Sequence, residues 1–139
     1  KTSAEYNLGL LNHPVKCLLW GNPRDVAVTG DVQIYLNGNE LFDSKMPDIF
    51  FTQVQGYYHS EHASELLKLD GGDNMKMYSF AIKASKHQPT GTCNFSRLDN
   101  ASLSITDGSL LPIVNAGLYA VNYNILRIKK GMGGLAFSN

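Results

Sequence analysis

The sequence is short of cysteine, of net charge and of long apolar runs, and each shortage excludes a class of protein. Its two cysteines, Cys17 and Cys93, have no CxxC partner nearby, which excludes a zinc finger. Twelve Lys and Arg balance twelve Asp and Glu, so the basic excess of a nucleic-acid-binding domain is missing. No run approaches the roughly 18 apolar residues that span a bilayer, which predicts a chain without a transmembrane segment.

What remains is a moderately apolar chain of the size of one domain. Its 139 residues are 43% apolar and 17% charged, a composition typical of globular proteins and not of disordered segments. No internal repeat, low-complexity tract or linker divides it, so we expect a single domain. Both cysteines are expected to be buried or half-buried free thiols, since Cys17 alternates with Val15 and Leu19 on an apolar face. Free thiols suit a reducing compartment.

Apolar and polar residues alternate with a period of two in several short segments, as in strands with one face on a core. Turn-forming Gly, Asn, Asp and Pro separate these segments. In one of them, Tyr78, Phe80 and Ile82 are expected on a common face. Gly131, Gly133 and Gly134 are expected to form a tight corner between two strands. We predict strands at residues 15–20, 32–36, 77–84, 101–106, 118–128 and 135–137, a pattern typical of a β-sandwich or barrel.

Residues 44–69 break this alternation and predict one or two short helices in a long connection between strands. Pro47 stands at a plausible first helical position. Apolar residues follow it at helical spacing, namely Ile49, Phe50 and Val54, and later Ala63, Leu66 and Leu67.

Three clusters resemble reactive or ligand-binding motifs, and each lacks a necessary part. His59 and His62 stand three residues apart, but they form no HExxH motif and have no third ligand. Residues 70–74 have the composition of a calcium loop without its alternating oxygen ligands and terminal Glu. Residues 129–134 place lysines before glycines, the reverse of a phosphate-binding loop. We therefore expect no catalytic residue, no metal and no cofactor.

The segment around residues 94–102 holds polar side chains with structural rather than reactive roles. Asn94 and Asn100 each open a glycosylation sequon, a triplet that is frequent by chance. If this stretch is extended, Arg97 and Asp99 alternate onto one face and can form an ion pair.

Three segments together resemble the major capsid proteins of nucleocytoplasmic large DNA viruses. They are NHPVKCLLW at residues 12–20, HQPTGTCNFSRLDNA at residues 87–101, and AVNYNILRIKKGMGGLAF at residues 120–137. The central block is specific, because fifteen residues with Pro, Gly, Cys, Arg and Asn in this order rarely recur by chance. The resemblance covers about residues 11–139 and is strongest to the C-terminal half of algal-virus, mimivirus-like and iridovirus members.

This resemblance implies an all-β fold, an antiparallel jelly-roll sandwich that forms the second half of a double jelly roll. Residues 1–139 are expected to be its C-terminal domain with the first strand missing, a fragment that opens at Lys1. It implies a structural and non-enzymatic protein of the virion, assembled in the host cytoplasm. The implied partners are its own copies in trimeric pseudo-hexagonal capsomers, neighbouring capsomers and minor capsid proteins, without direct contact to nucleic acid.

The motif residues are expected to hold the shape of irregular segments, since Pro and Gly turn a chain and Asn, Ser, Arg and Asp side chains bond to its backbone. Contact between copies is expected on the helical connection and the loops, although the same apolar residues could cap the core. The motif residues are Asn12, His13, Pro14, Gln88, Pro89, Gly91, Asn94, Arg97, Asp99, Asn100, Asn122, Tyr123 and Asn124, and the interface residues are Ile49, Phe50, Phe51 and Tyr57.

Two other functions remain open from the sequence alone. A lectin-like sandwich would bind sugars through Tyr57, Tyr58 and the loop at residues 70–74. An enzyme would have to use the pair His59 and His62.

Overall fold

The computed structural model describes residues 3–21, 29–61, 75–106 and 117–137, and within these ranges the chain is mostly β. Its helical segments are short, namely η1 (Phe50–Val54), α1 (Gln55–His59) and η2 (Phe95–Arg97). No helix in these ranges is long and apolar enough to cross a membrane. The strands are β1 (Ser3–Asn7), β2 (Pro14–Gly21), β3 (Asp31–Leu36), β4 (Asn39–Glu40), β5 (Met75–Ser79), β6 (Cys93–Asn94), β7 (Ala101–Thr106), β8 (Gly117–Asn122), β9 (Leu126–Lys129) and β10 (Met132–Leu135).

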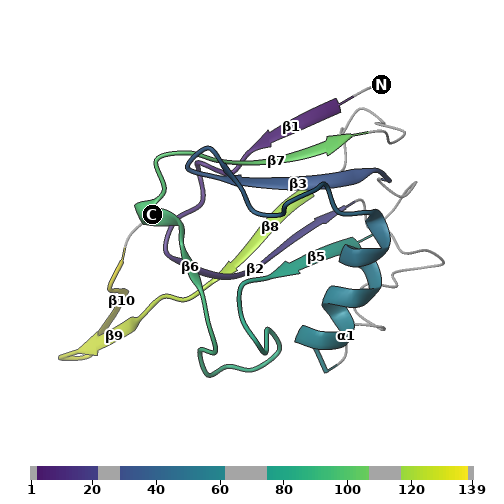
Figure 1. Ribbon diagram of the computed structural model, residues 1–139. Helices are drawn as coiled ribbons and strands as arrows, with labels where there is room; N and C mark the ends of the chain where they lie inside the picture. The colour runs from purple at the N-terminus through teal and green to yellow at the C-terminus, as the bar shows by residue number, and fades with distance from the viewer. Residues whose placement is uncertain (1–2, 22–28, 62–74, 107–116, 138–139) are drawn as a thin grey trace.

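Most of the strands form two antiparallel sheets (Figure 1). The first sheet has the order β1-β7-β3-β4, with Ile34 of β3 opposite Leu103 of β7. The second sheet is built around β2, which pairs with β5 and β6 along one edge and with β8 along the other. The two sheets make the β-sandwich that the alternating pattern predicts.

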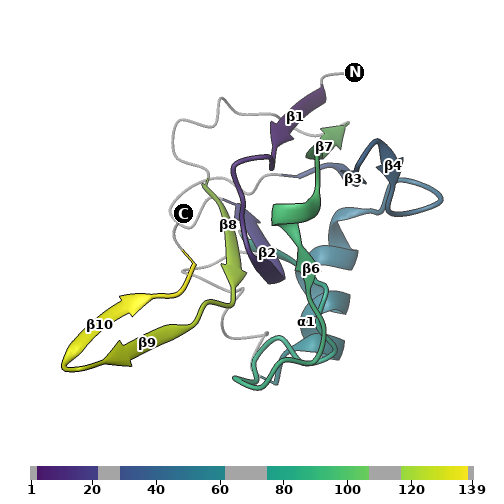
Figure 2. The same ribbon diagram turned by 90° about the vertical axis from the view of Figure 1, so that its left-hand side faces the viewer.

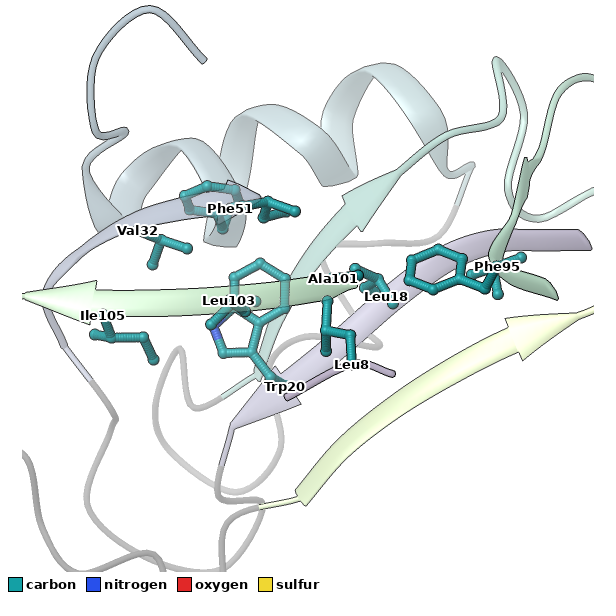
Figure 3. Packing of buried hydrophobic residues seen from close by; sticks show 11 residues of the cluster. Leu8, Leu18, Trp20, Val32, Phe51, Phe95, Ala101, Leu103 and Ile105 are labelled. Atoms are coloured by element: carbon teal, nitrogen blue, oxygen red, sulfur yellow. The ribbon is translucent and has the colours of Figure 1, made fainter. Parts of the chain in front are cut away.

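The main core lies between these sheets, where side chains of both converge (Figure 3). The alternation predicted for β7 is confirmed, because Ala101, Leu103 and Ile105 are buried and the intervening residues are only partly so. Close contact between two faces of this kind removes apolar surface from water and drives folding. The buried cluster comprises Leu8, Val15, Leu18, Trp20, Val32, Ile34, Phe51, Phe95, Ala101, Leu103 and Ile105.

The apolar face predicted for residues 15–20 is wrong, because β2 contains an irregularity. Its register against β8 shifts between Val15 and Cys17, as in a β-bulge. One extra residue reverses the alternation, so Leu18 and Trp20 join Val15 in the main core. Cys17 and Leu19 pack instead in a second apolar cluster, whose other members are Met75, Met77 and Ala84.

Two predicted strands are shorter than their apolar patterns. The strand predicted at 77–84 ends at Ser79, and Ile82 beyond it is exposed. The strand predicted at 118–128 is divided into β8 and β9. The predicted glycine corner is confirmed at Gly131 alone, since Lys130 and Gly131 have φ of 52° and 77° and join β9 to β10 in a hairpin. Gly133 and Gly134 lie within β10, so the last strand is Met132–Leu135, and the strand predicted at 135–137 is wrong.

The helical connection lies alongside β5 (Figure 1), where η1 and α1 follow each other without a break. The side-chain carbonyl of Gln55 accepts a hydrogen bond of 3.0 Å from the backbone amide of Ser79 in β5. Among the described strands β5 pairs with β2 alone, so Gln55 supplies an acceptor to a backbone amide on the open side of β5. The helix predicted around Ala63, Leu66 and Leu67 lies outside the residues described.

Candidate functional site

The first and second motif segments meet at one end of β2. The backbone amide of His13 donates to the hydroxyl of Ser96 at 2.8 Å, and the amide of Phe95 donates to the carbonyl of His13 at 3.1 Å. His13 is buried with φ at 68°, a conformation that non-glycine residues rarely adopt. The two hydrogen bonds hold this unfavourable backbone in place.

The third motif segment joins the first at the same end of the strand. The side-chain amide of Asn122 donates to the carbonyl of Asn12 at 3.0 Å, and the backbone amide of Tyr123 donates to the carbonyl of Pro14 at 2.9 Å. The ammonium of Lys16 lies 5.5 Å from the centre of the Tyr123 ring. We call residues 12–14, 94–96 and 122–124 together the motif junction.

Asn94 holds irregular backbone through its side chain, whereas Arg97 does not lie in an extended segment. The Asn94 side chain accepts a hydrogen bond of 3.1 Å from the amide of Ser96 and so begins the short helix η2. Because Phe95–Arg97 is helical, the extended alternation assumed for Arg97 and Asp99 is wrong. The structure, in the ranges it describes, has no ion pair between those two residues.

Asp99 and Asn100 are held by Asn37, a residue that the sequence reasoning missed. The Asn37 side-chain oxygen accepts hydrogen bonds from the amides of Asp99 at 2.8 Å and of Asn100 at 3.3 Å. Asn37 itself has φ at 51° and precedes Gly38 at 77° in the turn between β3 and β4. An Asn-Gly pair between alternating segments is a strong hairpin signal, so the sequence predicts this turn but not the bonds from Asn37 to Asp99 and Asn100.

Gly91 has a conformational role in the loop before β6. Its φ is 138°, and a Cβ at this position would lie 2.8 Å from the carbonyl oxygen of Phe80. Glycine therefore permits both the backbone angle and the close approach. Gln88 and Pro89 are exposed in the same loop, and the structure does not bring them to the motif junction.

Asn124 closes the base of the β9–β10 hairpin. Its side-chain oxygen accepts from the amides of Ile125 at 2.7 Å and Phe137 at 3.4 Å, and its side-chain amide donates to the carbonyl of Phe137 at 2.8 Å. A backbone bond of 2.7 Å from Ala136 to Ile125 adds to this closure. The hairpin leaves the body of the molecule directly beyond the motif junction (Figure 2).

The residues expected at an interface divide into buried and exposed ones. Phe51 is fully buried, and its ring packs edge-on against Trp20 at 5.1 Å. It caps the core and cannot contact another copy in this fold, so its assignment to an interface is wrong. Phe50 is half-buried against Phe42, whereas Ile49 and Tyr57 are exposed.

His59, Cys17 and Cys93 are not part of the motif junction. The Nδ1 atom of His59 lies 3.2 Å from the carbonyl of Ile82, and His62 and residues 70–74 lie outside the residues described. Cys17 and Cys93 are free, and burial raises the pKa of both thiols. Among described residues, no group of three or more His, Cys, Asp or Glu could hold a metal ion.

The motif junction therefore has a structural role: its hydrogen bonds hold distant segments of the chain together. Its hydrogen bonds join backbone groups and neutral side chains from segments about 110 positions apart in the chain, such as Asn12 and Asn122. Such bonds fix the shape of irregular backbone between strands.

The comparisons with known proteins agree with this arrangement. The family model of the large eukaryotic DNA virus major capsid protein matches residues 22–134. The chain belongs to this family. The major capsid protein of Pyramimonas orientalis virus is 37% identical over 155 residues, which cover 92% of this chain and 37% of that protein. That of Phaeocystis pouchetii virus is 46% identical over 125 residues, which cover 86% of this chain and 22% of that protein.

Solved capsid structures share the fold. In a quasi-atomic model of the PBCV-1 virus capsid, one chain matches with a TM-score of 0.76 at 28% identity over 99% of this chain and 46% of its own length. The Faustovirus major capsid protein matches in fold, with a TM-score of 0.64 at 11% identity over 85% of this chain and 29% of its own. The predicted jelly-roll sandwich is thus confirmed. The chain spans less than half the length of these relatives.

Proposed function

We propose that this chain is the C-terminal jelly-roll domain, over residues 1–139, of a protein that self-associates into trimeric capsomers of an icosahedral shell. Its place of action is the virion, after assembly in the host cytoplasm, and it acts without catalysis or cofactor. Neighbouring capsomers and minor capsid proteins are its further partners.

The observation that carries this proposal is the motif junction. The segments that mark the chain as a member of the capsid family are bonded to one another through His13, Ser96 and Asn122. A shell subunit must present the same surface in every copy, since each contact recurs under symmetry. The side chains of Ser96 and Asn122 fix the backbone shape of these segments, which keeps the surface the same in every copy.

Sedimentation of the complete gene product tests the proposal. We expect trimers at micromolar concentration, and a strictly monomeric species would contradict self-assembly. A Ser96→Ala variant, which removes the acceptor for the His13 amide, should lower the melting temperature. Ser85→Ala is the matched control, because Ser85 is an exposed loop serine.

A lectin-like function is the second candidate, and exposed aromatic rings favour it. Tyr57 and Tyr58 are both exposed on α1, with ring centres 5.1 Å apart and planes at 88°. Exposed aromatic faces are a common platform for sugar rings. Binding on a glycan array that is lost in Tyr57→Ser/Tyr58→Ser, without oligomer formation, would replace the capsid proposal.

A further inference from the structure

Asn37 and Gly38 form the two-residue turn between β3 and β4, and they are the one Asn-Gly pair in the sequence. Both residues are exposed, and their φ angles of 51° and 77° lie in the left-handed region. Asparagine is among the chemically labile residues of proteins, because the backbone nitrogen of the next residue can attack its side-chain carbonyl carbon. Glycine has no Cβ to shield that nitrogen. The turn therefore combines the two residues that favour this reaction.

The Gly38 amide is available for the attack. Within the part of the chain that the structure describes, it donates a hydrogen bond to no backbone or side-chain acceptor. A Cβ at Gly38 would meet no atom within 4 Å, so the turn is open to water. The nucleophile of the reaction is thus neither bonded nor covered by the described residues.

Asn122 and Asn124 show the opposite arrangement. The amide of Tyr123, which follows Asn122, donates to the carbonyl of Pro14 at 2.9 Å. The amide of Ile125, which follows Asn124, donates to the Asn124 side-chain oxygen at 2.7 Å. Each of these amides must lose its hydrogen bond before it can attack, and that loss opposes the reaction.

The Asn37 side-chain oxygen accepts bonds from two donors that favour the attack. The backbone amides of Asp99 and Asn100 donate to it at 2.8 Å and 3.3 Å. When a nucleophile adds to the carbonyl carbon, this oxygen becomes an oxyanion, and amide donors that are already in place stabilise the charge that develops there. The hydrogen bonds that hold the turn thus also lower the barrier to its modification.

We propose that Asn37 is a site of spontaneous modification, at which its side chain closes on the Gly38 amide in the folded protein. The Gly38 nitrogen loses its proton to water and forms a bond to the Asn37 side-chain carbonyl carbon. The bond from that carbon to the side-chain nitrogen breaks, and the nitrogen takes up a proton and leaves as ammonia. Water then opens the cyclic imide at one of its two carbonyl carbons, which gives aspartate or isoaspartate at position 37. The reaction consumes one water molecule and needs no other reactant.

The two products differ in their effect on the turn. Aspartate leaves the main chain unchanged, and its carboxylate can accept the bonds from Asp99 and Asn100. Isoaspartate carries the main chain through the former side chain, which adds one carbon to a turn of two residues. The backbone bond of 2.8 Å from the Asn37 amide to the Asn100 carbonyl then loses its geometry as well. We expect isoaspartate to separate the β3–β4 turn from the residues that begin β7.

Peptide mapping of the complete gene product tests the proposal. Trypsin releases residues 25–45 as one peptide, which contains Asn37 and also Asn39 as an internal control. After incubation at neutral pH, mass spectrometry should find conversion of Asn37 and at least tenfold less conversion of Asn39. The rate at Asn37 in the folded protein should be no less than about one tenth of its rate in guanidinium chloride, because the reaction needs no unfolding. A slower rate in the folded protein, or equal rates at the two asparagines, would overturn the proposal.

Two variants separate the reaction from its consequence. Gly38→Ala should slow conversion of Asn37 at least tenfold, because the new methyl group shields the amide nitrogen, and an unchanged rate would overturn the mechanism. Asn37→Asp should melt at the temperature of the wild-type protein, whereas the purified isoaspartate form should melt at a lower one. Equal melting temperatures of these two proteins would contradict the release of the turn. The comparison within the wild-type protein remains decisive if Gly38→Ala fails to fold.

Discussion

The ammonium of Lys76 lies 2.9 Å from the carboxylate of Asp48, and only 1% of the Lys76 side chain is exposed, against 34% for Asp48. Lys76 is in β5, and Asp48 lies at the start of the helical connection, two residues before η1. The two atoms form no well-directed hydrogen bond, so attraction between charges holds them. The pair therefore ties the helical connection to the second sheet.

Removing the carboxylate should leave a buried cation without its partner. Loss of one partner from a buried ion pair lowers the free energy of unfolding by roughly 3–5 kcal/mol. Because Asp48 is partly exposed, we expect a smaller loss of about 2 kcal/mol for Asp48→Asn. Urea unfolding measures this free energy. Lys76→Met, which removes the buried charge itself, should cost less than Asp48→Asn.

The matched control is the exposed ion pair of Lys86 and Glu61, which has the same separation of 2.9 Å. Glu61→Gln should change the free energy of unfolding by less than about 1 kcal/mol, because water screens exposed charges. Equal effects of Asp48→Asn and Glu61→Gln would show that burial of Lys76 does not matter.

Gly91→Ala should destabilise the fold. The φ of 138° is unfavourable for alanine, and the new methyl group would lie 2.8 Å from the Phe80 carbonyl oxygen. We expect a loss of about 1–3 kcal/mol in the free energy of unfolding, the range for a residue in a strained backbone conformation. Gly134→Ala is the control, since its Cβ would meet no atom within 4 Å. Equal melting temperatures of the two variants would contradict this role for Gly91.

The parts of the fold that the sequence predicts are those set by local alternation and turn chemistry. The β7 strand is found where Leu103 and Ile105 alternate with polar residues, and the last hairpin turns at Gly131. Both features depend on residues within a few positions of each other. The hydrophobic period and the φ preference of glycine are sufficient to predict them.

The parts that the sequence did not predict depend on long-range contacts or on one-residue irregularities. The bulge between Val15 and Cys17 leaves no mark in the apolar pattern, yet it exchanges the two faces of β2. The bond from Asn37 to Asp99 spans 62 positions, and only the fold brings them together. Ile128 has the pattern of a core residue, but it lies on the arm formed by the β9–β10 hairpin, which the described body does not cover.

The buried thiols predict a loss of stability in alkali. Burial raises the pKa of the Cys17 thiol above its ordinary value, so the folded state retains a proton that the unfolded state releases. The free energy of unfolding should therefore fall as the pH rises above about 8.5, the ordinary pKa of a free thiol. Urea unfolding at pH 7 and at pH 10 measures this slope.

Cys17→Ala isolates the contribution of this thiol. The alanine variant should lose less stability between pH 7 and pH 10 than the wild-type protein. Burial also raises the pKa of Tyr78, whose contribution remains in both proteins and cancels in the comparison. Identical slopes for the two proteins would contradict the assignment to Cys17.

Asn124 is expected to control the order of the arm without supporting the core. Asn124→Ala removes three hydrogen bonds at the base of the hairpin, two accepted and one donated. Amide hydrogen exchange of residues 126–135 should become at least tenfold faster in this variant. A tenfold change corresponds to about 1.4 kcal/mol in the free energy of local opening, and the loss of three hydrogen bonds can lower that free energy by this amount. Exchange of β7 amides should stay unchanged.

Asn124→Asp is the informative companion variant. Its carboxylate can still accept hydrogen bonds from the amides of Ile125 and Phe137, but it cannot donate to the Phe137 carbonyl. Protection of the arm should therefore fall between that of the wild-type protein and that of Asn124→Ala. Asn122→Ala, which removes the bond to Asn12, should leave exchange in the arm unchanged while it accelerates exchange at the motif junction. If Asn122→Ala frees the arm as much as Asn124→Ala does, the whole junction and not the Asn124 side chain sets the direction of the hairpin.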